Sequence, residues 1–393
     1  MRDNEKKPAL RFKGFTDPWE QRKFEEIAVR SSVMSDKKGL PRVEYEDIIS
    51  GAGRLNKDIK LKESEKVGIV FHKGDVLYGK LRPYLQNWLL ASFNGLAVGD
   101  FWVLQPQNTD SSFLYRLVQS QQFDGVANQS TGTKMPRADW KLVSKTKFAM
   151  PHSVDEQAAI GAYFEHLDTL ITLHQRKYEK LVNIKKSMLD KMFPQNGASV
   201  PEIRFKGFTD PWEQRKVGTL IEDYTEKTVT QNQYPVLTSS QQQGIVLQED
   251  YFADRQVTTD NNVGYYVLPK GYFTYRSRSD TDVFVFNRNN IVDKGIISYY
   301  YPVFAPKSCD SNFLLRRLNH GIKKQLSMAA EGTGQKVLAH AKFKNMVVDV
   351  PSQSEQEKIG TILEELDTLI TLHQRKLEKL QNIKKSCLEK MFV

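Results

Sequence analysis

Basic, amide and tyrosine side chains gather at two places in the sequence where loops between strands are expected. Arginine and lysine can pair with phosphates or, bidentately, with guanine, and asparagine or glutamine can pair with adenine. The candidates in the first half are Lys80, Arg82, Tyr84, Gln86, Asn87, Lys134 and Arg137, and those in the second half are Tyr275, Arg276, Arg278, Asn287, Arg288, Gln335, Lys336 and His340. Any one of them is more simply explained as part of a solvated hairpin tip. The presence of a similar set in each half favours nucleic-acid binding.

The sequence contains no recognisable catalytic motif. Residues 74–81, GDVLYGKL, match seven positions of the phosphate-binding loop G-x-x-x-x-G-K-[ST], but Leu81 replaces the hydroxyl residue that holds magnesium. The segment also has the pattern of a strand and turn, so we do not expect a nucleotide site there. The two cysteines, Cys309 and Cys387, and seven scattered histidines are too few for a disulfide framework or a zinc site. We therefore expect no bound metal.

Composition and charge are those of a folded chain and permit a polyanionic partner, although evenly spread lysines on an ordinary soluble protein give the same net charge. Hydrophobic residues make up 39% of the 393 positions, which is ample for burying cores, and the formal net charge is +10. The longest apolar runs fall short of the ~18 residues of a membrane span, and the first residues lack the apolar stretch of a signal peptide. We expect a soluble, cytoplasmic protein that does not contact a membrane.

Two sequence elements occur twice, which indicates an internal duplication. RFKGFTDPWEQRK is found at residues 11–23 and again, without a difference, at residues 204–216. A 27-residue segment at residues 167–193 recurs at residues 366–392 with four differences. The long middle segments share almost nothing, which favours one frame carrying two different readers. Tighter packing constraints on the edges than on the middles remain an alternative explanation.

The second repeated element predicts two long helices, over residues 155–193 and 355–393. Apolar residues recur there at steps of three and four, typical of one helical face with a near-heptad seam. The seam includes Leu167, Ile171, His174 and Leu181 in the first copy and Leu366, Ile370, His373 and Leu380 in the second. Each helix has acidic residues in its first part and an excess of basic residues in its last part, so antiparallel packing would pair opposite charges. We therefore predict an antiparallel coiled coil with a pseudo-twofold axis, in which the two histidines fix the register.

The middle segments, residues 24–150 and 217–350, predict mixed α/β folds. Alternating apolar and polar residues broken by glycines predict strands in both, and helical spacing follows at residues 110–123 and 312–329. The order is the same in both segments, so we expect the same fold despite the unlike sequences. The predicted class is α+β, with two mixed α/β domains joined by two long helices packed as an antiparallel coiled coil.

The combination of these motifs resembles the specificity subunit of a type I restriction-modification system. The resemblance rests on the duplicated RFKGFTDPWEQRK box, the GDVLYGKLRPYL strands, the TGTKMPR loop at residues 131–137 and the repeated helices, and it extends over essentially the whole chain. It implies target-recognition domains at residues 1–154 and 204–354, scaffold helices at residues 155–193 and 355–393, and a linker at residues 194–203.

The resemblance also implies the partners and the division of chemistry. Each domain would read one half of a bipartite double-stranded DNA site, and the helices would dock two methyltransferase subunits, with restriction subunits added in the full complex. The chain itself would be non-catalytic and bind no cofactor. S-adenosylmethionine would belong to the methyltransferase subunits that methylate adenine, and ATP and magnesium to the restriction subunits.

Two other classes of protein remain open at this point. One is a non-enzymatic scaffold whose two inverted domains bind proteins instead of DNA. The middle segments carry net charges of only +4 and +2, which is weak for DNA binders and leaves this alternative open unless the positive charge is clustered or partners contribute contacts. The other is a nuclease or methyltransferase with an unrecognised site, which the absence of a matching motif disfavours.

Overall fold

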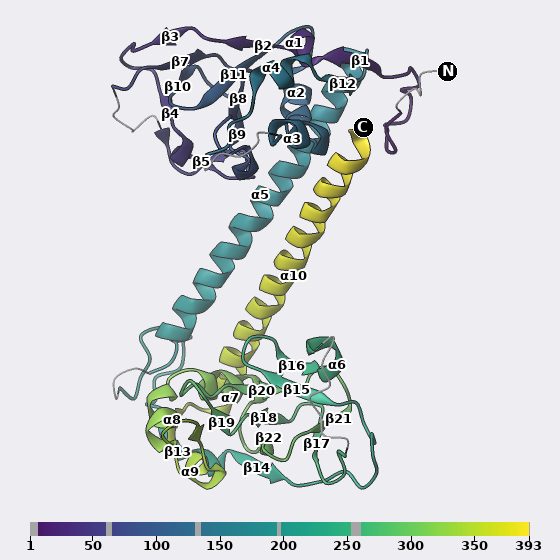
Figure 1. Ribbon diagram of the computed structural model, residues 1–393. Coiled ribbons are helices and arrows are strands. Elements are labelled where there is room, and N and C mark those ends of the chain that lie inside the picture. Colours follow the sequence, from purple (N-terminus) through teal and green to yellow (C-terminus); the bar gives the residue numbers. More distant parts are fainter. Residues whose placement is uncertain (1–6, 60–64, 130–134, 195–197, 253–260, 393) are drawn as a thin grey trace. The chain divides into compact units, whose positions relative to one another are not determined.

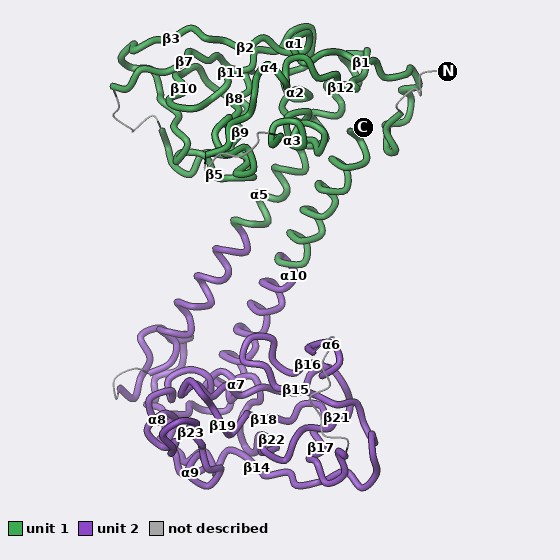
Figure 2. Tube along the Cα trace, in the orientation of Figure 1, with its two compact units in different colours: residues 1–176, 374–393 green, residues 177–373 purple. Residues whose placement is uncertain are grey.

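The chain folds into two compact units that are connected twice. The computed structural model describes residues 7–59, 65–129, 135–194, 198–252 and 261–392. Unit 1 comprises residues 1–176 and 374–393, and unit 2 comprises residues 177–373 (Figure 2). Two long helices, α5 (Val154–Lys191) and α10 (Gln353–Met391), are labelled in Figure 1, and each contributes one part to each unit (Figure 2). They are the helices expected from the repeated segments. Over the described parts of the chain, no helix has the length and apolar character that crossing a membrane requires.

Unit 1 contains two four-stranded sheets and a set of short helices. One sheet is antiparallel, in the order β2 (Ala28–Ser31), β11 (Phe101–Pro106), β8 (Val76–Gly79), β9 (Trp88–Leu90). The other has the order β3 (Met34–Ser35), β7 (Gly68–Phe71), β10 (Gly95–Ala97), β4 (Arg42–Val43). Two small ladders join β1 (Glu20–Lys23) to β12 (Lys147–Met150) and β5 (Ile48–Ile49) to β6 (Arg54–Leu55). The helices are α1 (Phe24–Ile27), α2 (Ser111–Leu117), α3 (Gln121–Ala127) and α4 (Trp140–Lys145), with 3₁₀ turns at Tyr45–Asp47 and Pro83–Leu85.

Strand β8 shows how the layers of unit 1 are built. Val76 and Tyr78 lie in the core shared with the helices, whereas Leu77 lies in the core that also contains residues of the second sheet. Successive side chains of a strand point to opposite faces, so a strand between two cores must be apolar at every position. All four residues of β8 are buried, and its sequence therefore lacks the alternation of a half-exposed strand.

Unit 2 repeats the principal sheet of unit 1 with unlike residues. Its antiparallel sheet has the order β14 (Ile221–Tyr224), β22 (Val303–Pro306), β18 (Phe273–Tyr275), β20 (Phe286–Arg288). Two-stranded ladders join β13 (Glu213–Lys216) to β24 (Val347–Val350), β15 (Leu237–Ser240) to β16 (Gly244–Leu247), β17 (Tyr266–Pro269) to β21 (Lys294–Ile297) and β19 (Arg278–Ser279) to β23 (Lys336–Val337). The helices are α6 (Gln248–Tyr251), α7 (Ser311–Asn319), α8 (Lys323–Ala329) and α9 (His340–Lys344), with a 3₁₀ turn at Val217–Thr219. The ladder β13–β24 corresponds to β1–β12, so both the four-stranded order and its flanking ladder are duplicated.

The helical stretches expected at residues 110–123 and 312–329 are confirmed, and each is divided into two short helices. In unit 1, α2 ends at Leu117, and Ser120 caps the start of α3, where its hydroxyl accepts a hydrogen bond from the Phe123 amide at 3.2 Å. In unit 2, Gly321 lies between α7 and α8 with a positive φ of 94°. A single glycine of this kind ends a helix at little cost because it has no Cβ.

The start of each long helix is clamped by the duplicated box. Nε and one terminal nitrogen of Arg11 donate to the two carboxylate oxygens of Glu156, at 2.6 and 2.7 Å. Glu156 is only 1% exposed. Arg204 repeats the arrangement with Glu355 at 2.7 and 2.7 Å. These bidentate pairs satisfy a buried charge and fix the box against the helix.

A glycine in each long helix permits close contact with the neighbouring short helix. A Cβ at Gly161 would lie 1.7 Å from the Ser112 hydroxyl, and a Cβ at Gly360 would lie 2.4 Å from a carboxylate oxygen of Asp310. Asp310 caps α7 by accepting a hydrogen bond from the Phe313 amide at 2.8 Å. The glycine therefore lets the capped end of the short helix pack directly on the long one.

The last residues of each long helix complete the core of the unit in which that helix ends. Phe193, which follows α5, stacks on Phe313 of unit 2 with ring centroids 5.8 Å apart. Phe392, which follows α10, stacks on Phe113 of unit 1 at 5.5 Å. Each unit thus depends on an aromatic residue from the end of a helix that begins in the other unit.

Candidate nucleic-acid interface

In unit 1, three of the predicted basic residues converge on one carboxylate and one turn. Lys80 and Arg137 each contact one carboxylate oxygen of Asp100, with nitrogen–oxygen distances of 3.4 and 3.1 Å. Burial alone would raise the pKa of Asp100, but the hydrogen bonds and charges of Arg137 and Lys80 outweigh it and lower the pKa. Asp100 therefore stays ionised and holds two cations at the surface.

The turn after β8 presents Arg82 and Tyr84. Arg82 has a positive φ of 49°, and its amide donates to the carbonyl of Pro136 at 2.7 Å, which ties the turn to the segment that carries Arg137. The Tyr84 side chain is 56% exposed. Within the described residues the buried Nε of Arg82 has no hydrogen-bond partner. The turn thus combines an arginine and an exposed aromatic ring, a pair that can contact phosphates and bases.

Asn87 and Lys134, also predicted for this cluster, are not seen to contribute exposed side chains to it. Asn87 was expected at a loop tip, but it is 8% exposed and directly precedes β9, where its carbonyl accepts a hydrogen bond from Gly79 at 2.7 Å. Asn87 thus lies in the loop before β9 as predicted, but its expected exposure was wrong, because pairing of β8 with β9 draws the residue inward. Lys134 lies outside the described residues.

In unit 2, the prediction that Tyr275 emerges at a loop was wrong. Tyr275 is the last residue of β18 and is fully buried. Its hydroxyl lies 3.3 Å from Nδ1 of His340, whose Nε2 lies 2.9 Å from Asp223, and Asp223 also accepts a hydrogen bond from Lys344 at 2.6 Å. Burial would raise the pKa of Asp223, but its bonds to Lys344 and His340 lower it. Tyr275 is a core residue, in the same place on its strand as buried Tyr78 of β8.

The arginines that follow Tyr275 are exposed and differ in their surroundings. The Arg278 guanidinium stacks over the Tyr300 ring at 4.2 Å from the centroid, which fixes its plane. Lys336 lies opposite Ser279 in the β19–β23 ladder, so the structure brings it beside this pair of arginines from a distant part of the sequence. Arg276 lines two neighbouring cavities of about 480 and 530 Å³.

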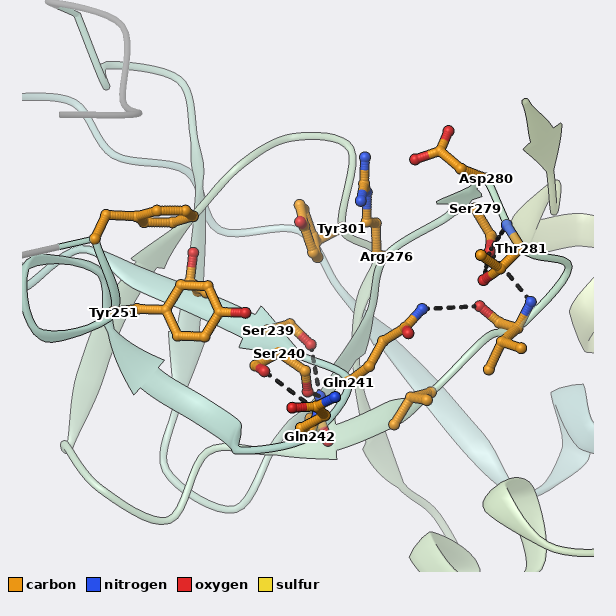
Figure 3. A pocket seen from close by; sticks show the side chains of 15 residues that line it. Ser239, Ser240, Gln241, Gln242, Tyr251, Arg276, Ser279, Asp280, Thr281 and Tyr301 are labelled. Carbon is orange, nitrogen blue, oxygen red and sulfur yellow. Dashed lines mark hydrogen bonds between the residues drawn. The ribbon is translucent and has the colours of Figure 1, made fainter. Parts of the chain in front are cut away.

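The glutamines that form another part of the cavity wall were not predicted as site residues from the sequence. The turn between β15 and β16 carries Gln241, Gln242 and Gln243, and the first two line the cavity of about 480 Å³ with Arg276 (Figure 3). The signal was a run of amides, SSQQQG, but sequence alone does not show that it lies near residue 276. The position of this turn depends on the tertiary structure, in which β15 and β16 pair as a hairpin whose turn carries the glutamines.

The predicted seam residues of the long helices are buried to different degrees. Leu167 and Leu366 are buried, in the cores of unit 1 and unit 2 respectively. The partly buried residues are Ile171, His174, Leu181, Ile370, His373 and Leu380. Within unit 1, Tyr163 lies 3.6 Å from Cys387 and Asp168 lies 2.7 Å from Lys384, so residue numbers rise along α5 as they fall along α10.

A family of known proteins matches both halves of the chain. The family is described as the type I restriction modification DNA specificity domain, and it matches residues 16–183 and 210–382. The chain belongs to this family. The two matched regions contain the basic residues described above in each unit and most of both long helices, as the internal duplication requires.

Two relatives carry the name of a type I specificity subunit. The type I restriction enzyme MjaVIII specificity subunit of Methanocaldococcus jannaschii is 23% identical over 289 residues, which are 66% of this chain and 64% of the relative. The EcoDI specificity subunit of Escherichia coli is 25% identical over 127 residues, which are 31% of this chain and 28% of the relative. The chain thus matches less than two thirds of the length of either one.

A solved structure shares the fold of this type I specificity-family member over its whole length. The type I restriction-modification system S subunit from M. genitalium superposes with a TM-score of 0.62, covers 99% of both chains and is 13% identical. At this identity the comparison supports the two-domain α/β architecture and not any single residue's role.

Proposed function

We propose that this chain reads a DNA sequence as the specificity subunit of a type I restriction-modification assembly. The observation that carries the proposal is the match of the DNA specificity domain to both halves, each of which presents basic side chains at the end of an equivalent strand. The strand is β8 in unit 1 and β18 in unit 2. Two such readers with unlike residues suit a bipartite target with two different half-sites.

The weak net charge of the middle segments is compatible with DNA binding because basic side chains are clustered locally. Lys80, Arg82 and Arg137 come together around one turn, although the whole segment is only slightly basic. Phosphate contacts depend on such local groups and not on the net charge of a domain.

We further propose that α5 and α10 pair as an antiparallel coiled coil with a pseudo-twofold axis. The antiparallel contacts within unit 1 support this, as does the ion pair between Lys185 and Asp367 within unit 2. A scaffold of this kind would hold two half-sites about one helical turn of DNA, ~34 Å, apart.

We propose that the exposed faces of the same helices dock the methyltransferase subunits, with restriction subunits added in the full complex. Leu173, Leu369 and Leu372 are 45%, 42% and 44% exposed, and Leu173 and Leu372 occupy equivalent positions of the repeat. Apolar side chains repeated on both helices suit two copies of one partner. The chain itself would be non-catalytic and hold no cofactor, with S-adenosylmethionine in the methyltransferase and ATP and magnesium in the restriction subunits.

The test is methylome sequencing of cells that express this chain with a type I methyltransferase subunit, together with binding of the purified complex to duplex DNA at increasing salt. We expect one bipartite methylated motif and an affinity that falls with salt. Arg82→Ala should relax or weaken one half-site and leave the other unchanged. Absence of any motif together with salt-independent or undetectable DNA binding would refute the proposal and favour a protein-binding scaffold.

A further inference from the structure

The glutamine turn of unit 2 is held in place from two sides. The Ser240 hydroxyl accepts hydrogen bonds from the backbone amides of Gln242 and Gln243 at 3.3 and 3.2 Å. The Asn287 amide donates to the Ser239 hydroxyl at 2.8 Å and to the Ser240 carbonyl at 2.9 Å, which anchors the hairpin to β20. A rigid turn can present a side chain to a ligand without a large loss of entropy on binding.

The three glutamines of this turn are not equivalent. The Gln241 amide donates to the Val283 carbonyl at 3.4 Å, so its donor is already engaged. Gln242 is exposed and lines the cavity of about 480 Å³, and within the described residues its side-chain amide has no hydrogen-bond partner. Gln243 is exposed as well but lines neither this cavity nor the one of about 530 Å³. Gln242 is thus the glutamine available for a ligand in the cavity.

Arg276 and Arg278 also differ in whether their side chains are already engaged. Arg278 is stacked on Tyr300, whereas Arg276 makes neither an ion pair nor a side-chain hydrogen bond with any described residue. Figure 3 shows the Arg276 side chain, from the residue that directly follows β18, extending beyond Tyr301. A guanidinium in this position has its full set of donors available.

The wall of the cavity favours a base edge over a phosphate. Asp280 lines the same cavity as Arg276 and accepts a hydrogen bond from Gln335 at 2.9 Å. Its carboxylate would repel a phosphate, but it can accept a hydrogen bond from the amino group of cytosine. A cavity with a guanidinium, a carboxylate and an amide offers both donors and acceptors, as the edge of a base pair does.

Resting on the DNA-reading function proposed above, we propose that this cavity is the base-reading site of unit 2. Arg276 pairs with a guanine and the Gln242 amide with an adenine of the same half-site, whereas Arg278 contacts a phosphate. Bidentate Arg–guanine and Gln–adenine pairs are the side-chain geometries that discriminate bases in the major groove.

The test is selection of bound sequences from a random duplex DNA library with the full-length chain and its Arg276→Ala, Gln242→Ala and Gln243→Ala variants, alone and in complex with a methyltransferase subunit. Arg276→Ala should lose preference at one G·C pair, and Gln242→Ala at one A·T pair, each by about 5- to 160-fold. Gln243→Ala is the matched control and should select the parent sequence. Arg278→Ala should weaken binding to all sequences alike and reduce the slope of log affinity against log salt by about one.

The possible results distinguish failure of the base-reading site from failure of the specificity function. If the parent chain selects a bipartite sequence but Arg276→Ala and Gln242→Ala select it equally well, the base-reading site is wrong and the specificity function stands. If Gln243→Ala changes the motif as much as Gln242→Ala does, the assignment to the cavity is wrong. If the parent chain enriches no sequence in either form, the proposed function itself fails.

Discussion

Replacement of Phe193 by alanine should destabilise unit 2 and leave unit 1 folded, although the helix that ends there begins in unit 1. Phe193 is 1% exposed, stacks on Phe313 and lies edge-on to Trp212 with centroids 6.0 Å apart. A buried Phe→Ala substitution costs about 3–5 kcal/mol through lost transfer energy and the cavity that remains. The two aromatic neighbours place the expected cost in the upper part of that range.

The measurement is amide hydrogen exchange resolved by segment, because a chain with two units does not unfold in a single two-state transition. At ~1.4 kcal/mol per tenfold change, a cost of about 4–5 kcal/mol means that the most protected amides of α7 should exchange about 700- to 4,000-fold faster in Phe193→Ala, while those of α2 keep their protection. Phe392→Ala is the matched control and should give the reverse pattern, since Phe392 stacks on Phe113 of unit 1. Equal loss of protection in both units, or loss only in unit 1, would refute the assignment of these phenylalanines.

Three further results are expected. Glu355→Gln should destabilise unit 2 by about 3–5 kcal/mol, because it leaves Arg204 partly buried without its charge partner. The double change with Arg204→Leu should recover part of this loss in segment-resolved hydrogen exchange of unit 2, and unchanged protection in Glu355→Gln would contradict the prediction. The pKa of Asp223 is lowered in the folded chain, so its contribution to stability is complete above its unfolded pKa of about 4 and is lost as pH falls through the folded pKa; Asp223→Asn should therefore be less stable at neutral pH and show a shallower loss in acid, and an unchanged acid profile would contradict this. Exchange of residues 24–150 with 217–350 should leave a folded, assembled protein, because each segment ends in the same type of ladder with its duplicated box. Its methylated half-sites should be exchanged about the spacer. Methylation of the unexchanged site would show that specificity lies elsewhere.

The sequence was sufficient for the elements whose stabilisation is local or repeated. Steps of three and four between apolar residues predicted α5 and α10 to within two residues, because a long helix makes its hydrogen bonds within itself and needs only an apolar face. The duplicated boxes predicted a repeated architecture, and the same sheet order is observed in both units. Lys80 and Arg82 in the first half and Arg276 and Arg278 in the second half were also singled out from residue type alone.

The tertiary structure decided what depends on contacts between distant residues. From the sequence alone, Tyr275 cannot be distinguished from an exposed tyrosine that binds a ligand. In the structure β18 lies within the sheet of unit 2, and Tyr275 contacts His340, which in turn contacts Asp223. These contacts form only when the sheet forms. The position of Gln242 beside Arg276 depends on a hairpin that Asn287 anchors, and the burial of Phe193 depends on a unit whose sequence mostly follows it. Periodicity and composition report on neighbours a few residues apart, whereas strand pairing and core packing join residues separated by tens or hundreds of positions.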